Sequence, residues 1–468
     1  MATAAEQCTR TLTDVAGLLE TKAVSPVELT RAVLERIEAV DATLHAYLTV
    51  TADAALEAAR EAEREIVAGR YRGPLHGVPL GIKDLCATRG VRTTCASRIL
   101  ATWVPDHDAS VVQRLRASGA VLLGKLNMTE FAYGGYHPSL PVPVNPWNPD
   151  RWPGASSSGS GVATAAGLCF GALGSDTGGS IRFPSAACGI VGMKPTYGRV
   201  SRSGVFPLAE SLDHIGPMAR SVADAAVLLG AIAGFDPTDP TTRRDPVPDY
   251  AAGLPEGIRG LRIGIDEAYC RTDTEPEVAA AALAAGAVLR EAGAQLVEVT
   301  VGGLLEAARD WYVVCAAEAA AAHERWFPRR AAEYGPTFRA LLEDGIRLRA
   351  LDYARAHVAR QRVCRVLDDA WQQADLLLCP SMPTLPAPVA DFAPDAVLPR
   401  EVVAPLLRFT APFDFTGSPT ISVPCGFSAS GLPLSLQLVG RHGAEEVVLR
   451  AGHAYEQATG WHRRRPPV

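Results

Sequence analysis

A run of small residues near the middle of this sequence limits what the chain can fold into more than any other feature. Two Gly/Ser-rich segments, 153–161 and 174–182, lie on either side of the small apolar stretch 162–171, which suits a tightly packed helix. On their own, Gly/Ser-rich segments are usually flexible loops. Here, however, apolar residues resume directly after the second glycine-rich turn, with Ile181 and Phe183. The flexible-loop interpretation is therefore disfavoured for the second segment, which we interpret as a turn that ends at Ser180.

The segments around these turns alternate between helical and strand patterns. Ser25-Pro26-Val27-Glu28 is a capping box with proline at the first helical position. A turn and a short apolar strand lead to Lys83. Further helices are predicted at 52–68, 108–118 and, in an Ala-rich region, across most of 276–371, and further strands at 120–123, 376–379, 420–423 and 434–439. This alternation predicts an α/β fold with a large, mixed, mostly buried sheet and helices on both of its faces.

The composition excludes several classes of function. Of the 468 residues, 48% are hydrophobic, and the formal net charge is −6 with both signs interspersed along the chain. No basic patch attracts nucleic acid, and neither a signal peptide nor an apolar run of 18 residues points to a membrane. The ten cysteines lack metal-ligand spacing, so we expect reduced thiols, no metal and no cofactor. The cytoplasm is the expected location.

The turn Thr177-Gly178-Gly179-Ser180 is a candidate oxyanion site. Because glycine has no Cβ, the backbone can direct several N–H groups into one concavity, where they stabilise a developing negative charge. The Ser180 hydroxyl would lie beside these donors. A phosphate-binding loop is disfavoured, because it needs Gly-Lys-Ser/Thr and neither Gly/Ser-rich segment contains a lysine.

A serine becomes a strong nucleophile only when a base removes its proton. None of the ten histidines lies in either Gly/Ser-rich segment. Lys83 ends an apolar strand, where burial would lower the pKa of its amine and allow the neutral form to act as the base. Taken alone, such a lysine is more often solvated or paired with a carboxylate, and Asp84 is adjacent.

Three blocks of the sequence closely resemble the catalytic blocks of the amidase signature family and occur in that family's order. They are Gly77-Val-Pro-Leu-Gly-Ile-Lys83-Asp84, Pro153-Gly-Ala-Ser156-Ser157-Ser-Gly-Ser160 and Gly174-Ser-Asp-Thr-Gly-Gly-Ser180-Ile-Arg-Phe-Pro184. The family's two catalytic serines stand 24 residues apart, as Ser156 and Ser180 do here. The similarity continues through 127–132, 192–200, 212–217, 416–419 and 431–440, and thus covers about residues 25–460.

The resemblance implies a role for each matching residue. Lys83 would be the neutral base, Ser156 a proton bridge preceded by a cis peptide bond, and Ser180 the acylated nucleophile. The oxyanion hole would consist of the backbone N–H groups of Thr177, Gly178, Gly179 and Ser180. Asp176 and Arg182 would support the turn, and Ser157 would be a structural hydrogen bonder.

The second block departs from the family's usual Gly-Gly-Ser-Ser-Gly-Gly. Ala155 and Ser158 stand where the family has glycines. This change can alter the backbone next to Ser156, but the three proposed catalytic residues are intact.

The resemblance also divides the chain, which is expected to be one domain of residues 1–468. The expected parts are an N-terminal helical region (1–70), a catalytic core (71–235), a variable helical region that forms the substrate pocket (about 276–371) and a C-terminal return to the sheet (372–468). The pocket is expected to involve Met128, Tyr133, Gly134, Tyr136, Trp311, Tyr312 and Trp326. Aromatic residues of Ala-rich helices are nevertheless more often part of the core.

Three functions remain open at this point. The first is an amidase that cleaves a small aryl or alkyl amide, or a carbamate, whose carbonyl is similar. The second is a glutaminase-like subunit of a tRNA-dependent amidotransferase, which works only in a complex. The third is a non-enzymatic scaffold, which the presence of Lys83, Ser156 and Ser180 disfavours. For a stand-alone amidase we expect a monomer or homodimer with a small-molecule substrate.

Overall fold

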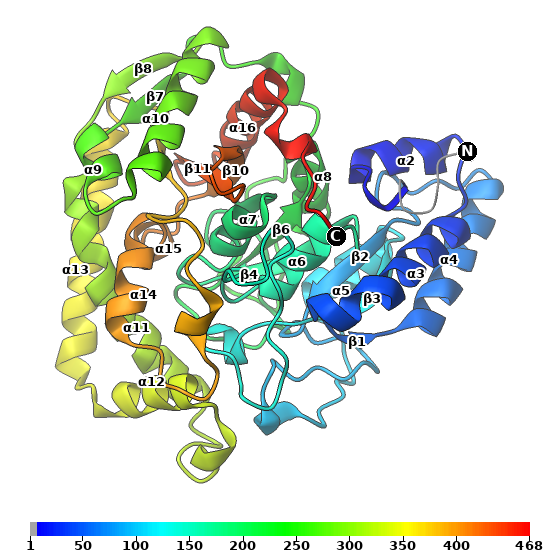
Figure 1. The fold of residues 1–468 in the computed structure, drawn as a ribbon, viewed down its shortest axis with the longest axis horizontal. Helices are drawn as coiled ribbons and strands as arrows, with labels where there is room; N and C mark the ends of the chain where they lie inside the picture. The colour runs from blue at the N-terminus through cyan, green and yellow to red at the C-terminus, as the bar shows by residue number, and fades with distance from the viewer. Residues whose placement is uncertain (1–6) are drawn as a thin grey trace.

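A computed structural model describes residues 7–468, and its centre is one large mixed β-sheet (Figure 1). The strands are β1 (Tyr47–Val50), β2 (Pro79–Lys83), β3 (Val121–Leu126), β4 (Gly171–Asp176), β5 (Val191–Lys194), β6 (His214–Ala219), β7 (Arg262–Ile265), β8 (Gln295–Glu298), β9 (Leu376–Pro380), β10 (Thr420–Phe427) and β11 (Pro433–Gly440). Their order in the sheet is β1-β3-β2-β4-β6-β5-β10-β11-β9-β7-β8. Strands β3, β2 and β4 pair in parallel, as do β9, β7 and β8, and the remaining pairs are antiparallel.

Helices cover this sheet and confirm the predicted α/β class. They are α2 (Leu12–Glu20), α3 (Pro26–Leu44), α4 (Ala52–Val67), α5 (Ser110–Ala117), α6 (Ser158–Ala166), α7 (Arg182–Cys188), α8 (Val222–Ile232), α9 (Glu267–Arg271), α10 (Pro276–Glu291), α11 (Ala307–Ala322), α12 (Pro336–Arg347), α13 (Ala350–Ala370), α14 (Arg400–Leu406), α15 (Ala411–Phe415) and α16 (Glu445–Thr459). The Ser25 side chain caps α3 through the predicted capping box.

Both faces of the sheet are buried. Every residue of β2, β3, β4 and β6 is buried, although alternate side chains of a strand point to opposite faces. The sheet is most open at its edges: β8 is exposed at both of its ends, and its neighbour β7 has half-buried ends. The pairing of β5 with β10 joins the first half of the chain to its last quarter, so one continuous core surrounds the sheet.

The region 276–371 contains one element that the sequence pattern does not predict. It is largely helical, as expected, but β8 lies between α10 and α11 and extends the sheet beyond β7. Strand β8 is a four-residue edge strand with two half-buried side chains, so it carries little of the alternation that reveals a strand.

Of the ten free cysteines, nine are buried and Cys364 is partly exposed. Between residues 7 and 468, no helix is both long and apolar enough to cross a membrane.

Candidate active site

The sheet brings the ends of two sequence blocks together. Strands β2 and β4 run parallel and are neighbours, so their last residues, Lys83 and Asp176, emerge at the same edge of the sheet. Helix α6 begins just after Ser156 and Ser157, and it packs against both strands. The three blocks therefore meet at one place, although almost 100 residues separate the first from the last.

Lys83 is completely buried and surrounded by hydroxyl groups. Its Nζ lies 2.6 Å from the Ser156 Oγ, 2.8 Å from the Ser157 Oγ and 2.8 Å from the Ser175 Oγ. Burial lowers the pKa of the Lys83 amine to about 7, because desolvation penalises the ammonium form. A neutral amine can donate to two of these hydroxyls and accept a proton from the third.

Asp84 does not neutralise Lys83, although the two are adjacent in sequence. Its Oδ2 accepts hydrogen bonds from the backbone N–H of Thr94 (2.9 Å) and from the Thr94 hydroxyl (2.5 Å). Its Oδ1 lies 3.9 Å from the Nζ of a different buried lysine, Lys125. The Lys83 amine thus has no carboxylate partner among the described residues, which favours the base over the salt-bridged alternative.

Ser156 and Ser180 lie at the two turns that the Gly/Ser-rich segments form. The Ala155–Ser156 peptide bond is cis, as the resemblance implies. The backbone N–H of Ser157 donates to the Ser180 carbonyl oxygen at 3.3 Å, which ties the turns together. The Ser180 hydroxyl makes no hydrogen bond to another described residue, and Ser180 retains 9% exposure where it lines a cavity. Its hydroxyl is therefore the accessible one of the pair.

The backbone of the turn 177–180 is held by side chains from distant helices. The Trp311 indole N–H donates to the Thr177 carbonyl oxygen at 2.6 Å, and the Thr410 hydroxyl donates to the Gly178 carbonyl oxygen at 2.6 Å. Gly178 must be glycine, because a Cβ there would lie 2.4 Å from the Trp311 ring. Because both carbonyl oxygens point toward these donors, the peptide N–H groups of the turn can point away from them.

Three of the four expected oxyanion donors lack a partner within residues 7–468. The N–H of Gly179 donates to the Asp176 Oδ1 at 2.6 Å and is therefore engaged. The N–H groups of Thr177, Gly178 and Ser180 make no such bond. These three N–H groups thus remain available to an oxyanion, whereas the Gly179 N–H helps to shape the turn.

Asp176 and Arg182 form a fully buried ion pair below the turn. The Arg182 Nη2 lies 2.8 Å from the Asp176 Oδ1 and the Nε lies 3.0 Å from the Oδ2, and the backbone N–H groups of Ile181 and Arg182 also donate to this carboxylate. Burial alone would raise the pKa of Asp176, but the attraction of Arg182 outweighs it and lowers the pKa.

A second carboxyl group completes this ion pair. Asp414, from α15, lies 2.6 Å from the Arg182 Nη2. Burial raises the pKa of Asp414 well above its ordinary range, against the attraction of Arg182. Arg182 thus binds two buried carboxyl groups whose pKa values are shifted in opposite directions.

An apolar cavity of about 50 Å³, here called the front cavity, adjoins the nucleophile. Ser180, Thr177 and Gly178 form its polar edge. The rest of the lining is aromatic or aliphatic, with Trp152, Phe183, Trp311, Phe392, Leu406 and Leu407 among the larger side chains. None of its lining residues carries a charge.

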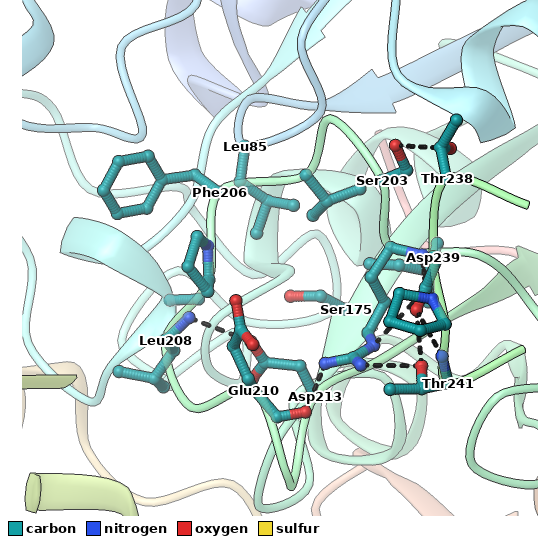
Figure 2. Close-up of a pocket in the computed structure, with 16 residues that line it drawn as sticks. Leu85, Ser175, Ser203, Phe206, Leu208, Glu210, Asp213, Thr238, Asp239 and Thr241 are labelled. Atoms are coloured by element: carbon teal, nitrogen blue, oxygen red, sulfur yellow. Dashed lines mark hydrogen bonds and ion pairs between the residues drawn. The ribbon is translucent and has the colours of Figure 1, made fainter. Parts of the chain in front are cut away.

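A second cavity, here called the back cavity, has a volume of about 170 Å³ and is lined by both apolar and charged residues (Figure 2). Ser175, a hydroxyl neighbour of Lys83, lines it together with the charged residues Arg202, Glu210, Asp213 and Asp239. Ala132 and Leu208 line both cavities, so the two adjoin.

The residues expected to form the substrate pocket lie in different places. Tyr133, Gly134 and Trp311 line the front cavity. Trp326 lies with Phe206 along a separate open cavity nearer the surface. Met128 and Tyr136 belong to the buried core, and the Tyr312 hydroxyl donates to the Asp344 carboxylate at 2.7 Å.

Several residues of the site have no signal in the local sequence. Thr410 and Asp414 reach the turn from more than 200 residues away, and nothing in their neighbourhood marks them as partners of Gly178 and Arg182. Ser175 could have been suspected, because it belongs to the third block, but the spacing does not say which hydroxyls face Lys83.

Comparisons with known proteins agree on one family. A family model described as Amidase matches residues 28–449. A Mycobacterium tuberculosis protein provisionally named amidase AmiD is 48% identical, over 98% of this chain and 96% of the relative. A glutamyl-tRNA(Gln) amidotransferase subunit of Moorella thermoacetica is 43% identical, over 97% of this chain and 98% of the relative. The solved peptide amidase of Stenotrophomonas maltophilia is 35% identical, covers 98% of both chains and superposes with a TM-score of 0.86.

Proposed function

This chain belongs to the amidase signature family and is an amidase acting on C–N bonds, and we propose that it hydrolyses small amides with an uncharged acyl group through an acyl-enzyme on Ser180. In this proposal neutral Lys83 takes the Ser180 proton through the Ser156 hydroxyl. The Ser180 Oγ attacks the carbonyl carbon, and the N–H groups of the turn stabilise the oxyanion. The amine then departs, and water releases the acid by the reverse route.

The uncharged lining of the front cavity supports an apolar acyl group. The acyl part of the substrate stays bonded to the Ser180 Oγ, so it occupies the cavity that Ser180 lines. Aryl or alkyl groups gain from contact with Trp152, Phe183 and Trp311, whereas a charged group would be desolvated without a partner. Carbamates fit the same proposal, because a urethane presents a similar carbonyl to the nucleophile.

The same observation argues against a glutaminase, although an amidotransferase subunit is among the relatives. The acyl part of glutamine carries an α-ammonium and an α-carboxylate group. Neither group finds an opposite charge in the front cavity. The proposed enzyme therefore works without an amidotransferase partner, and our proposal retains a monomer or homodimer in the cytoplasm.

The isolated chain should be assayed on a panel of phenylacetamide, butyramide, an aryl carbamate and glutamine. We expect kcat/KM for the apolar amides to exceed that for glutamine at least about 100-fold, which corresponds to about 2.7 kcal/mol. A fluorophosphonate should block this activity and leave its adduct on Ser180, with Ser180→Ala as the unreactive control. A preference for glutamine, or an adduct on Ser156, would contradict the proposal.

A further inference from the structure

The back cavity adjoins the proposed catalytic lysine, and the steps proposed so far give it no role. Ser175, whose hydroxyl lies 2.8 Å from the Lys83 Nζ, lines it, whereas Ser180 lines the front cavity. Ala132 and Leu208 belong to both linings, so the two cavities share a wall. The front cavity thus contacts the proposed nucleophile, and the back cavity contacts Ser175 beside the proposed base.

The path of the proton assigns the two halves of an amide to these cavities. Lys83 receives the Ser180 proton through Ser156 and returns it by the same hydroxyl to the substrate nitrogen as the C–N bond breaks. The acyl group stays on the Ser180 Oγ, and the amine leaves in its neutral form. The nitrogen must therefore face the Ser156 hydroxyl, which lies 2.6 Å from the Lys83 Nζ, and the back cavity reaches the same Nζ through Ser175.

Three of the four charged side chains of the back cavity are occupied by other groups. The Arg202 Nη2 donates to the Tyr197 hydroxyl and to the Thr241 Oγ1, both at 2.9 Å. The Asp239 carboxylate accepts the Arg202 backbone N–H at 2.8 Å and the Thr241 hydroxyl at 2.6 Å. Asp213 accepts the Thr177 hydroxyl at 2.6 Å and several backbone N–H groups.

Glu210 is the exception. Its backbone oxygen accepts from the Tyr197 hydroxyl at 2.8 Å and from the Arg202 guanidinium, but its exposed carboxylate makes no hydrogen bond or ion pair within residues 7–468. The charged lining of the cavity comprises three acidic side chains and one arginine, so its field favours a cation. A cationic group that enters this cavity would find one free carboxylate.

We propose that the back cavity binds the amine half of the substrate and that Glu210 selects amines that carry a second, positively charged group. This inference rests on the proposed hydrolysis of amides at Ser180. The substrate class is an amide with an apolar acyl group and an aminoalkyl amine. Its distant ammonium pairs with Glu210, while its amide nitrogen faces the Ser156 hydroxyl.

Four amides of similar size test this assignment. N-(3-aminopropyl)butanamide has a cationic amine half, N-butylbutanamide a neutral one and 4-(butanoylamino)butanoate an anionic one, while 4-amino-N-butylbutanamide places the cation in the acyl half. We expect wild-type kcat/KM to favour the cationic over the neutral amine about 3- to 5-fold at low ionic strength, because a partly exposed ion pair contributes modestly. High salt should reduce this ratio.

Variants of Glu210 test whether the charge of this side chain, and not its size, determines the preference for a cationic amine. Glu210→Gln should bring the ratio of cationic to neutral substrate close to one, and Glu210→Lys should shift the preference to the anionic amine. Glu291→Gln, which removes an exposed carboxylate at the end of α10 outside the cavity lining, should keep the wild-type ratio. An unchanged ratio in Glu210→Gln overturns the inference.

Two further outcomes distinguish this inference from the proposed function. If Glu210→Gln changes only the amide with the cation in its acyl half, the assignment of the cavities is reversed and the inference is overturned, while hydrolysis at Ser180 stands. If folded wild-type protein cleaves none of the four amides or the simpler panel, the proposed function fails and the inference fails with it.

Discussion

At the scale of single residues, the protonation of Lys83 controls the proposed reaction. Its Nζ contacts three hydroxyl oxygens and no carboxylate among the described residues, and burial lowers its pKa to about 7. The amine is therefore charged below this pH and neutral above it. Only the neutral form can accept the proton of Ser180.

We expect kcat/KM to rise with pH through about 7 and to level off in the alkaline range. Lys83→Ala should lower kcat/KM about 10²- to 10⁴-fold, since it removes the base. Lys83→Arg should be as damaging, because a guanidinium stays protonated. The measurement is kcat/KM across pH on one amide, with circular dichroism to show that the variants fold. Near wild-type activity in the arginine variant would mean that Lys83 supplies only positive charge.

The sequence predicts a site residue when the residues next to it form a recognisable motif, and it does not predict contacts that only the folded chain creates. Lys83, Ser156 and Ser180 lie in short blocks whose composition already suggests their chemistry. The engagement of the Gly179 N–H by Asp176 depends on the exact path of the backbone through the turn, which residue types do not encode. Ser175 faces Lys83 because β2 and β4 are neighbours in parallel, and that pairing is a property of the folded sheet.

At the scale of elements, the loop 129–134 shapes both cavities. Ala132 lines both of them, and Phe131 and Ala132 have positive φ angles of 45° and 65°. Non-glycine residues adopt this conformation only when their surroundings hold it. The buried Glu130 supplies such an anchor: it accepts the Ser97 hydroxyl at 2.6 Å and the Gly335 N–H at 2.7 Å, at the start of α12.

Glu130→Ala should release this loop and destabilise the protein by about 1–3 kcal/mol, because the buried Gly335 N–H loses its acceptor. We expect KM for apolar amides to rise, while the pH at which kcat/KM is half-maximal stays unchanged. Glu130→Gln is the matched control, since its amide can still accept from Gly335 and should keep KM near the wild-type value. Steady-state kinetics and thermal unfolding measure both effects. A wild-type KM in the alanine variant would contradict an anchoring role.

The glutamine variant also tests the charge of Glu130. Burial raises the pKa of this carboxyl to about 7, so the folded state holds its proton more tightly than the unfolded state does. The group therefore stabilises the fold fully below about pH 4.5, and this contribution is lost as the pH rises to about 7. Relative to Glu130→Gln, the wild-type Tm should fall across this window. Parallel Tm curves would show that Glu130 does not titrate there.

Helices and strands that have a clear capping motif or a clear apolar pattern are predicted well from the sequence, and short elements without such a pattern are not. The capping box at Ser25 marks the start of α3, and the apolar run before Lys83 is β2. Strands β7 and β8 escape prediction because each has only four residues with mixed burial. The position of β7 and β8 in the sheet depends on the pairing of β7 with β9. Strand β9 comes much later in the sequence than both of them.

At the scale of the whole molecule, Arg182 connects the catalytic turn to the C-terminal part of the chain. It binds Asp176 next to the turn, and it also binds Asp414 and the Gln437 Oε1, the latter at 3.0 Å. All of these groups are completely buried. The geometry of the oxyanion turn therefore depends on segments that enter the sheet last.

Because burial favours neutral Asp414, we expect Asp414→Asn to retain kcat/KM within about threefold, since asparagine can still accept from Arg182. Asp414→Ala removes the acceptor and should destabilise the protein by about 1–3 kcal/mol and lower kcat more than KM. Chemical denaturation and steady-state kinetics measure the two effects. Equal losses in both variants would show that the negative charge of Asp414 is required, against the direction of its pKa.

The contact between Arg182 and Asp414 also determines when, during synthesis of the chain, the support of the turn can form. The two residues are 232 positions apart, and a ribosome adds about 5–20 residues per second. Roughly 10 to 50 seconds thus pass between the synthesis of the nucleophile's turn and that of the carboxyl group that completes its support. During this interval the nascent chain carries the proposed nucleophile, Ser180, but lacks the groups that support the proposed oxyanion turn. The proposed activity is therefore delayed at least until Asp414 has been synthesised.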